Sequence, residues 1–190
     1  MKLAIGIPTG GTIKSQTAFS LFRMVHHLPF EYNIIFKEGS ILHHNREMIV
    51  KEAIRLGCSH LLFIDSDMFF EADAVIQLLE RKKDIIGVNY CLRKLPPTTT
   101  VKIDPDKWAR MKEEHPDGLL TCDAVGTGFM LINLDVFKKL TEPWFFWKSD
   151  EKGDVVEGED AWFCRKAREA DYEIWVDLSV KMGHIGDTIY

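Results

Sequence analysis

The chain has 190 residues, of which 46% are hydrophobic and 28% are charged. These are the proportions of an ordinary globular protein, and the length is enough for one domain that buries its own core. The formal net charge of −5 at pH 7 argues against broad electrostatic attraction to a nucleic-acid backbone.

The four cysteines lie far apart and form no CxxC pair, so neither a zinc site nor a redox motif is indicated. We expect them to be reduced and mostly buried. The N-terminal apolar run meets Pro8 too early for a secretory signal, and no segment approaches the roughly 20 apolar residues of a membrane span. The expected location is therefore cytoplasmic.

The first half of the chain alternates apolar strands with amphipathic helices. A buried strand is predicted at 3–7, ending in the loop Pro8-Thr9-Gly10-Gly11, and a helix follows with Ser15 as its N-cap. The pattern then predicts strands at 33–36, 61–64 and 84–90, with a helix around 48–56 that Gly57 ends and a helix around 75–79. Such alternation indicates a mainly parallel sheet with helices on both faces.

The second half is less regular. We expect residues 92–116, which are polar with at most a short helix at 108–115, to form a loop over a ligand site. Apolar runs then surround Gly126-Thr127-Gly128, and the pattern predicts helices at 135–140 and 161–170 and a strand at 173–178. Half of the four aromatic residues at 144–147 are expected in the core, because a fully exposed patch would be costly. The other half would form a lid or a stacking surface.

Polar residues follow three of the predicted strands. Thr9, Glu38 and the pair Asp65 and Asp67 stand at these strand ends, and in such sheets ligands bind beyond the carboxyl ends of the strands. In an extended strand, the two aspartates would project from one face about 6–7 Å apart. A divalent cation could neutralise both. An acidic loop or a helix N-cap is the simpler interpretation of the motif.

The order of these features resembles that of the GT-A glycosyltransferases over most of the chain. IPTGG is similar to their first strand and loop, KEGS to the turn after their second strand, and HNREMIVKEAIRLGCSHLLFIDSDM to the stretch that ends in their DxD motif. VGTGFMLI resembles their acceptor-side strand, EGEDAWFCRKAREADYEIW the helix that begins with their Glu-Asp pair, and MGHIG their late metal-site histidine. The resemblance implies an α/β fold with a Rossmann-like mixed, mainly parallel sheet flanked by helices. It also implies one domain over 1–190, with a nucleotide-binding half at 1–91 and an acceptor and metal-site half at 119–190.

The resemblance further implies metal-dependent transfer of a sugar from a UDP- or GDP-sugar to an acceptor hydroxyl on a glycan, protein, small molecule or modified nucleic acid. Mn²⁺ or Mg²⁺ would be held by Asp65, Asp67 and His184 and would neutralise the leaving diphosphate. Asp160, with Glu159 beside it, would be the general base for the acceptor hydroxyl. The donor would be bound by Pro8, Thr9, Glu38, Arg46, Asp65, Ser66 and Gly128, the last of which makes room for the sugar.

Other interpretations stay open. Acidic residues at a helix start, such as Glu159 and Asp160, are favourable through the helix dipole alone. Arg46 fits a solvated helix face as well as a diphosphate contact, and Glu38 stands where many members of the superfamily have Asp. For the whole chain, a nucleotidyltransferase also places carboxylates on a metal at strand ends, and a binding module that has lost catalysis would keep the fold.

Overall fold

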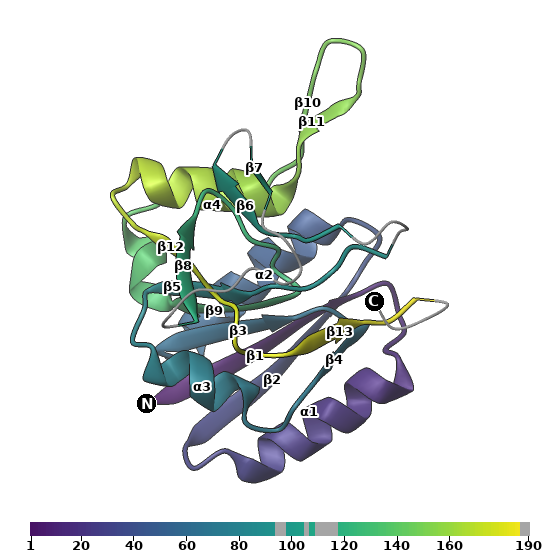
Figure 1. Cartoon of the computed structure of the whole chain (residues 1–190), viewed down its shortest axis with the longest axis vertical. Helices are drawn as coiled ribbons and strands as arrows, with labels where there is room; N and C mark the ends of the chain where they lie inside the picture. The colour runs from purple at the N-terminus through teal and green to yellow at the C-terminus, as the bar shows by residue number, and fades with distance from the viewer. Residues whose placement is uncertain (94–97, 105–106, 109–117, 187–190) are drawn as a thin grey trace.

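The computed structural model describes residues 1–93, 98–104, 107–108 and 118–186, which adopt an α/β fold (Figure 1). The helices are α1 (Ser15–His27), α2 (Leu42–Arg55), α3 (Ala74–Glu80) and α4 (Glu159–Glu169), with a 3-10 helix η1 (Leu134–Lys138). The strands of the central sheet are β1 (Lys2–Thr9), β2 (Glu31–Glu38), β3 (His60–Ile64), β5 (Ile85–Val88), β8 (Leu119–Cys122), β9 (Phe129–Asn133) and β12 (Ile174–Asp177). Smaller antiparallel pairs join β4 (Met68–Phe70) to β13 (Met182–His184), β6 (Lys102–Asp104) to β7 (Lys107–Trp108), and β10 (Lys148–Ser149) to β11 (Val155–Glu157).

The central sheet has seven strands in the order β2-β1-β3-β9-β5-β12-β8. Strand β1 pairs in parallel with β2 and β3, and β5 pairs in parallel with β12. Strand β9 is inserted antiparallel between β3 and β5, and β8 runs antiparallel to β12 at the far edge. The sheet is therefore mixed and mainly parallel, which confirms the predicted fold class.

The apolar strands serve two hydrophobic cores, one on each face of the sheet. In β3, Leu61 and Phe63 belong to the core under α2 and α4, whereas Leu62 and Ile64 belong to the core under α1 and α3. All four side chains are fully buried. A strand covered on both faces has no polar side, which explains why this run is continuously apolar and not alternating.

The predicted helices are present, with changes at their ends. Gly57 follows α2 with a φ of 67°, a left-handed conformation that favours glycine, as the C-cap prediction required. Ser15 is the first residue of α1 and Lys14 occupies the cap position, so the predicted Ser15 cap is wrong. The helix expected at 135–140 is the 3-10 helix η1, and α4 already begins at Glu159. The helix expected at 108–115 lies, beyond Trp108, outside the described residues.

Burial agrees with the sequence-based expectations for cysteines and aromatics. All four cysteines are free and buried. Trp144 and Phe145 are buried, whereas Phe146 and Trp147 are each 40% exposed, so half of this aromatic cluster lies in the core. Within the described ranges, no helix combines the length and apolar character needed to cross a bilayer.

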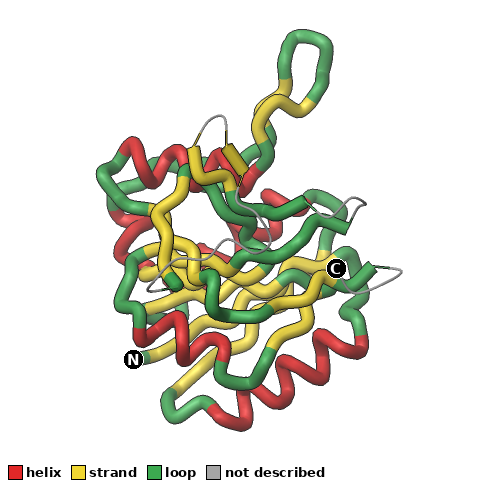
Figure 2. Tube along the Cα trace, viewed as in Figure 1, coloured by secondary structure: helices red, strands yellow, loops and turns green. Residues whose placement is uncertain are grey.

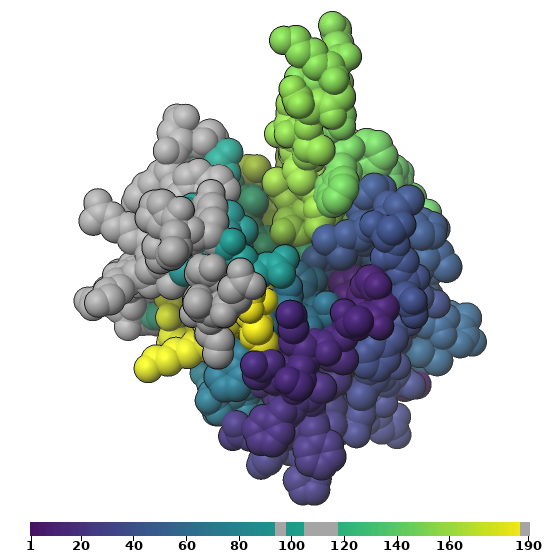
Figure 3. Space-filling view, turned by 90° about the vertical axis from the view of Figure 1, so that its right-hand side faces the viewer, coloured from purple at the N-terminus to yellow at the C-terminus, as the bar shows by residue number. Residues whose placement is uncertain are grey.

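The β10–β11 hairpin projects from the body of the molecule. It is seen as a tube in Figure 2 and as a protruding green arm in the space-filling view of Figure 3. The chain returns from this hairpin directly into α4. The end of β11 is therefore next to the first turn of α4 in the chain and helps to set the position of that turn.

Candidate active site

A pocket of about 340 Å³ lies at the carboxyl ends of β1, β2 and β3. Parallel strands end at the same edge of a sheet, which brings their terminal loops together. Figure 3 shows N-terminal residues in purple and C-terminal residues in yellow adjoining on one face of the molecule. The pocket is lined by Pro8, Thr9, Gly10, Gly39, Ser40, Leu42, Asn45, Asp65, Ser66, Asp67, Arg93 and His184.

Six residues predicted to bind donor or metal therefore line one cavity. They are Pro8, Thr9, Asp65, Ser66, Asp67 and His184. The remaining predicted residues, Glu38, Arg46, Gly128, Glu159 and Asp160, lie outside this lining.

The motif Asp65-Ser66-Asp67 forms the turn between β3 and β4 and is not extended. The backbone N–H of Met68 donates to the carbonyl of Asp65 at 3.3 Å, which closes the turn. Because the chain turns here, the two carboxylates take different partners: Asp65 faces Arg46 and Asp67 faces His184. The expectation that both project from one strand face is wrong for this reason.

Arg46 is a buried cation at the centre of three carboxylates. Its side chain is 1% exposed, its Nη2 donates to Asp65 Oδ1 at 2.9 Å, and its Nε lies 3.7 Å from Glu159 Oε1. Although burial opposes the charge, the carboxylates of Asp65, Asp160 and Glu159 raise the pKa of Arg46. A solvated helix face is therefore the wrong interpretation. The guanidinium lies against carboxylates and outside the pocket lining, so the structure gives no support to a direct diphosphate contact.

The first turn of α4 carries the predicted catalytic pair. Glu159 is buried and accepts a hydrogen bond from the indole N–H of Trp147. Asp160 accepts a hydrogen bond from the hydroxyl of the buried Thr127. Burial, followed by the neighbouring charge of Glu159, raises the pKa of Asp160 to about 7. A carboxylate with such a pKa can exchange a proton near neutral pH.

His184 meets Asp67 because β13 pairs antiparallel with β4, which places His184 opposite Met68. Its Nε2 lies 3.3 Å from Asp67 Oδ1. Its Nδ1 lies 2.9 Å from the carbonyl of Cys91, and since a carbonyl can only accept, Nδ1 carries a proton. Burial alone would lower the pKa of His184, but the hydrogen bonds to Asp67 and to the Cys91 carbonyl, together with the charge of Asp67, raise it above its ordinary value.

Asp67 also forms an ion pair with Arg93 at 3.0 Å. The carboxylate is thus held by two cationic or potentially cationic groups. Against the opposing effect of burial, His184 and Arg93 lower the pKa of Asp67 and keep it ionised.

The donor chemistry of Asp67 and His184 fits a hard divalent cation. A carboxylate oxygen and an imidazole nitrogen suit Mn²⁺ or Mg²⁺, and because Nδ1 is bound to the Cys91 carbonyl, Nε2 is the ring nitrogen that could bind a cation beside Asp67. Asp65, the third predicted ligand, is turned to Arg46. Among the residues that the structure describes, no group of three His, Cys, Asp or Glu side chains is placed to hold a metal ion.

Tyr90 fills the space that Gly126 and Gly128 leave open. Its hydroxyl accepts a hydrogen bond from the backbone N–H of Gly128 at 2.9 Å. A Cβ built on either glycine would lie 2.4 Å from that hydroxyl. The space expected to receive the donor sugar at Gly128 is thus occupied by Tyr90. The Tyr90 ring also packs edge-on against His184, with ring centroids 5.5 Å apart.

Glu38 lines a second hollow of about 340 Å³ that shares Thr9 with the first pocket. The two strand ends are tied together, because the backbone N–H of Gly39 donates to the carbonyl of Thr9 at 3.0 Å. The Thr9 hydroxyl in turn donates to the carbonyl of Thr12 and accepts from the N–H of Gly11. Glu38 therefore adjoins the main pocket through the loop after β1.

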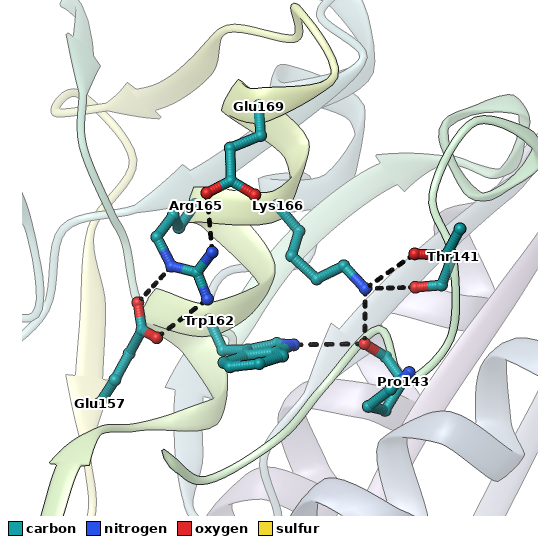
Figure 4. Close-up of polar contacts among 7 residues, drawn as sticks. All are labelled: Thr141, Pro143, Glu157, Trp162, Arg165, Lys166 and Glu169. Carbon is teal, nitrogen blue, oxygen red and sulfur yellow. Dashed lines mark hydrogen bonds and ion pairs between the residues drawn. The ribbon is translucent and has the colours of Figure 1, made fainter.

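A polar network outside the pocket anchors α4 (Figure 4). Arg165 donates to both carboxylate oxygens of Glu157, at 2.9 and 3.1 Å, and to Glu169 at 2.8 Å. Lys166 and the indole N–H of Trp162 both donate to the carbonyl of Pro143. These contacts tie α4 to β11 and to the segment before the hairpin, and so hold the turn that carries Asp160.

Tyr90, Arg93 and Thr127 contact predicted site residues but were not predicted as site residues themselves. Five further residues of the pocket lining were also not predicted: Gly10, Gly39, Ser40, Leu42 and Asn45. Tyr90 ends the strand predicted at 84–90, so the rule that singled out Thr9 and Glu38 applies to it as well. Arg93 stands in the segment expected to form a loop over the site. Thr127 lies between the two glycines noted in the sequence, but its hydrogen bond to Asp160 could not be predicted, because Asp160 is distant in the chain.

The sheet order, the layers and the pocket at the strand ends define a mixed α/β fold with a mainly parallel sheet flanked by helices, and glycosyltransferases of known structure have a similar fold. No protein-family model matches the chain, and no curated protein matches it. The comparisons therefore bear on the fold alone.

The proteins of known structure that share this fold include A197 from STIV and TarS from S. aureus. A197 from STIV matches with a TM-score of 0.70 at 20% sequence identity, over 98% of this chain and 87% of A197. The S. aureus glycosyltransferase TarS matches with a TM-score of 0.53 at 16% identity, over 94% of this chain but only 35% of TarS. Residues 1–349 of TarS in complex with UDP-GlcNAc match with a TM-score of 0.50 at 14% identity, over 94% of this chain and 56% of that fragment. At these identities the similarity shows the fold alone.

Proposed function

We propose that this chain is a glycosyltransferase that moves a sugar from a nucleoside-diphosphate sugar to an acceptor hydroxyl. The observation that carries the proposal is the single cavity in which the ends of β1, β2 and β3 meet Asp67 and His184. The shared fold with TarS supports it, and the TarS complex makes UDP-GlcNAc the first donor to test.

In this proposal Asp67 and His184 hold Mn²⁺ or Mg²⁺, with Asp65 oriented beside them by Arg46. When bound, the cation supplies positive charge to the leaving diphosphate. Pro8, Thr9 and Ser66 line the same cavity and contact the nucleoside side of the donor. Arg93 adds a second positive charge at the pocket wall.

Asp160 is the proposed general base. Its carboxylate takes the proton of the acceptor hydroxyl while that oxygen bonds to the anomeric carbon of the donor sugar. The bond from this carbon to the diphosphate breaks, and its electron pair leaves with the diphosphate. A pKa of about 7 suits this exchange at neutral pH. Thr127 and Arg46 position the carboxylate and stabilise its ionised form.

Isothermal titration with UDP and GDP, each with and without Mn²⁺, tests the donor site. We expect metal-dependent binding of at least one diphosphate, followed by release of that diphosphate from a matching donor in a screen that starts with UDP-GlcNAc. If no nucleoside diphosphate binds with metal present, the proposal fails.

The same assays separate the rivals. Pyrophosphate released from a nucleoside triphosphate and a sugar phosphate would identify a nucleotidyltransferase. Tight donor binding without hydrolysis or transfer across the donor panel would identify a binding module.

A further inference from the structure

Strand β2 lies at the edge of the central sheet and, among the described strands, pairs only with β1. It is eight residues long, from Glu31 to Glu38. An edge strand presents a row of backbone N–H and C=O groups that can pair with another strand. In Figure 1, β2 runs along the lower margin of the sheet.

The side chains of β2 are unusually apolar for a free edge. Tyr32, Ile34 and Phe36 are 40%, 39% and 52% exposed, respectively. They share one face of the sheet, because the register with β1 sets them opposite three residues of the core under α1, namely Leu3, Ile5 and Ile7. Helix α1 on this face carries two further exposed aromatic side chains, Phe19 and Phe22.

The sequence of β2, EYNIIFKE, is complementary to itself when read antiparallel. A two-fold axis perpendicular to the sheet leaves each side chain on the same face of the sheet in both copies. Because directly opposed residues of an antiparallel pair also share a face, the axis must pass through a residue and not between two residues. Centred on Ile34, the pairing sets Glu31 opposite Lys37, Tyr32 opposite Phe36, and Ile34 opposite its own copy. Opposite charges and aromatic pairs directly across an antiparallel ladder are stabilising.

A two-fold axis at either neighbouring residue would not set Glu31 opposite Lys37. Centring on Asn33 sets Glu31 opposite Ile35, and centring on Ile35 sets Lys37 opposite Asn33. Among the described residues, neither Glu31 nor Lys37 forms a direct ion pair, and Lys37 acts on Glu52 only through its charge, so both side chains can pair with a partner strand.

We propose that the protein forms a homodimer in which β2 pairs antiparallel with β2 of a second copy about a two-fold axis at Ile34. The central sheet then continues across both protomers, and Tyr32, Ile34 and Phe36 are covered by their counterparts. This interface is independent of the proposed enzymatic function.

Light scattering after size-exclusion chromatography, over a dilution series, measures the mass. We expect twice the chain mass of 21.9 kDa for the unchanged protein. Ile34→Lys sets two lysines opposite each other and should give the monomer mass, whereas Val156→Lys, at an exposed strand position on the hairpin arm, should leave the dimer intact. A monomeric unchanged protein, or a dimer that survives Ile34→Lys, overturns the proposal.

Charge exchange tests the register with variants that leave the apolar core untouched. Glu31→Lys and Lys37→Glu should each weaken the dimer, because like charges then face each other twice. The double variant restores opposite charges at both sites and should restore the dimer. Weakening in both single variants without recovery in the double variant contradicts the Ile34 register.

Disulfide cross-linking gives a positive signal. Directly opposed residues of an antiparallel pair have Cα atoms about 4.5–5.5 Å apart, within the range that a disulfide spans. Ile34→Cys should therefore form a covalent dimer under mild oxidation, while the four native cysteines are buried and stay reduced. Val156→Cys is the control. Equal cross-linking of both variants, or none at Ile34→Cys, refutes the two-fold axis at this residue.

Discussion

At the scale of single residues, the site depends on one buried guanidinium. Arg46 faces Asp65 and Glu159, and its Nε and Nη1 are buried without a hydrogen-bond partner. A buried ion pair contributes little compared with an apolar pair of similar shape, but removing one member leaves the other charge unpaired. Loss of Arg46 would leave several carboxylates without a counter-charge, whereas loss of one carboxylate would leave Arg46 paired with the others.

Arg46→Met should lower the free energy of unfolding by about 3–5 kcal/mol, because Asp65 and Glu159 then lose their buried counter-charge. Urea unfolding at neutral pH measures the change. Arg55→Met is the matched control, since Arg55 pairs with Glu52 on the exposed surface of α2 and should matter little. Equal effects of the two substitutions would contradict the central role of Arg46.

The raised pKa of Asp160 predicts a pH dependence of stability. A carboxyl whose pKa rises to about 7 on folding holds its proton in the folded chain while the unfolded chain has lost it. The unfolded state then binds fewer protons, so stability falls as the pH rises from the unfolded pKa of about 4 toward 7, by at most about 1.4 kcal/mol per unit. Asp160→Asn should remove this slope in urea unfolding across that range. A slope unchanged in the variant assigns it to another group.

Asp67 and Asp160 should differ in their effect on binding and turnover. Asp67→Asn removes the carboxylate that faces His184, so metal-dependent donor affinity and transfer should fall together. Asp160→Asn should keep donor affinity near that of the unchanged protein while turnover falls by about 10²–10⁴-fold, as for a lost general base. Titration and steady-state rates separate the two. If Asp160→Asn keeps most of its turnover, Asp160 is not the base.

At the scale of elements, α4 and the hairpin are held together by Arg165, which links Glu157 at the end of β11 to the body of the helix. The side chain of Arg165 is 34% exposed, so solvent screens this pair. The contact thus orients the hairpin more than it stabilises the fold.

Arg165→Gln should therefore lower the free energy of unfolding by at most about 1 kcal/mol. It should nonetheless speed cleavage by trypsin at Lys152 in the hairpin turn, because the base of the arm loses its bidentate contact. Limited proteolysis followed by mass spectrometry measures the site and rate. An unchanged rate at Lys152 would show that the hairpin is held by its backbone pairing alone.

At the scale of the whole molecule, ligand binding should stabilise the fold by mass action. At a free donor concentration a hundred times its dissociation constant, the expected gain is about 2.7 kcal/mol. UDP or GDP with Mn²⁺ should raise the melting temperature, and EDTA should reverse the shift if Asp67 and His184 hold the metal. A shift that persists in EDTA would show donor binding without a cation.

The sequence by itself determined the sheet class and the edge at which the site lies. The apolar run at 61–64 belongs to a strand buried on both faces. It could be predicted because the length of the run and the turn residues beside it are visible in the local sequence. Parallel strands end at the same edge of a sheet. Once the strands are recognised, the sequence therefore predicts that Thr9, Asp65 and Asp67 lie in one pocket, as they do in the structure.

Only the tertiary structure decided what each carboxylate faces. Asp65 and Asp67 diverge because the chain turns between β3 and β4, and the dihedral angles of that turn leave no periodic signal in the sequence. Arg46 meets Glu159, and Thr127 meets Asp160, across layers that pack only after the sheet has formed. Likewise, His184 reaches Asp67 through the pairing of two three-residue strands distant in the chain. Periodicity reports backbone conformation and burial, whereas these contacts depend on how separate elements pack.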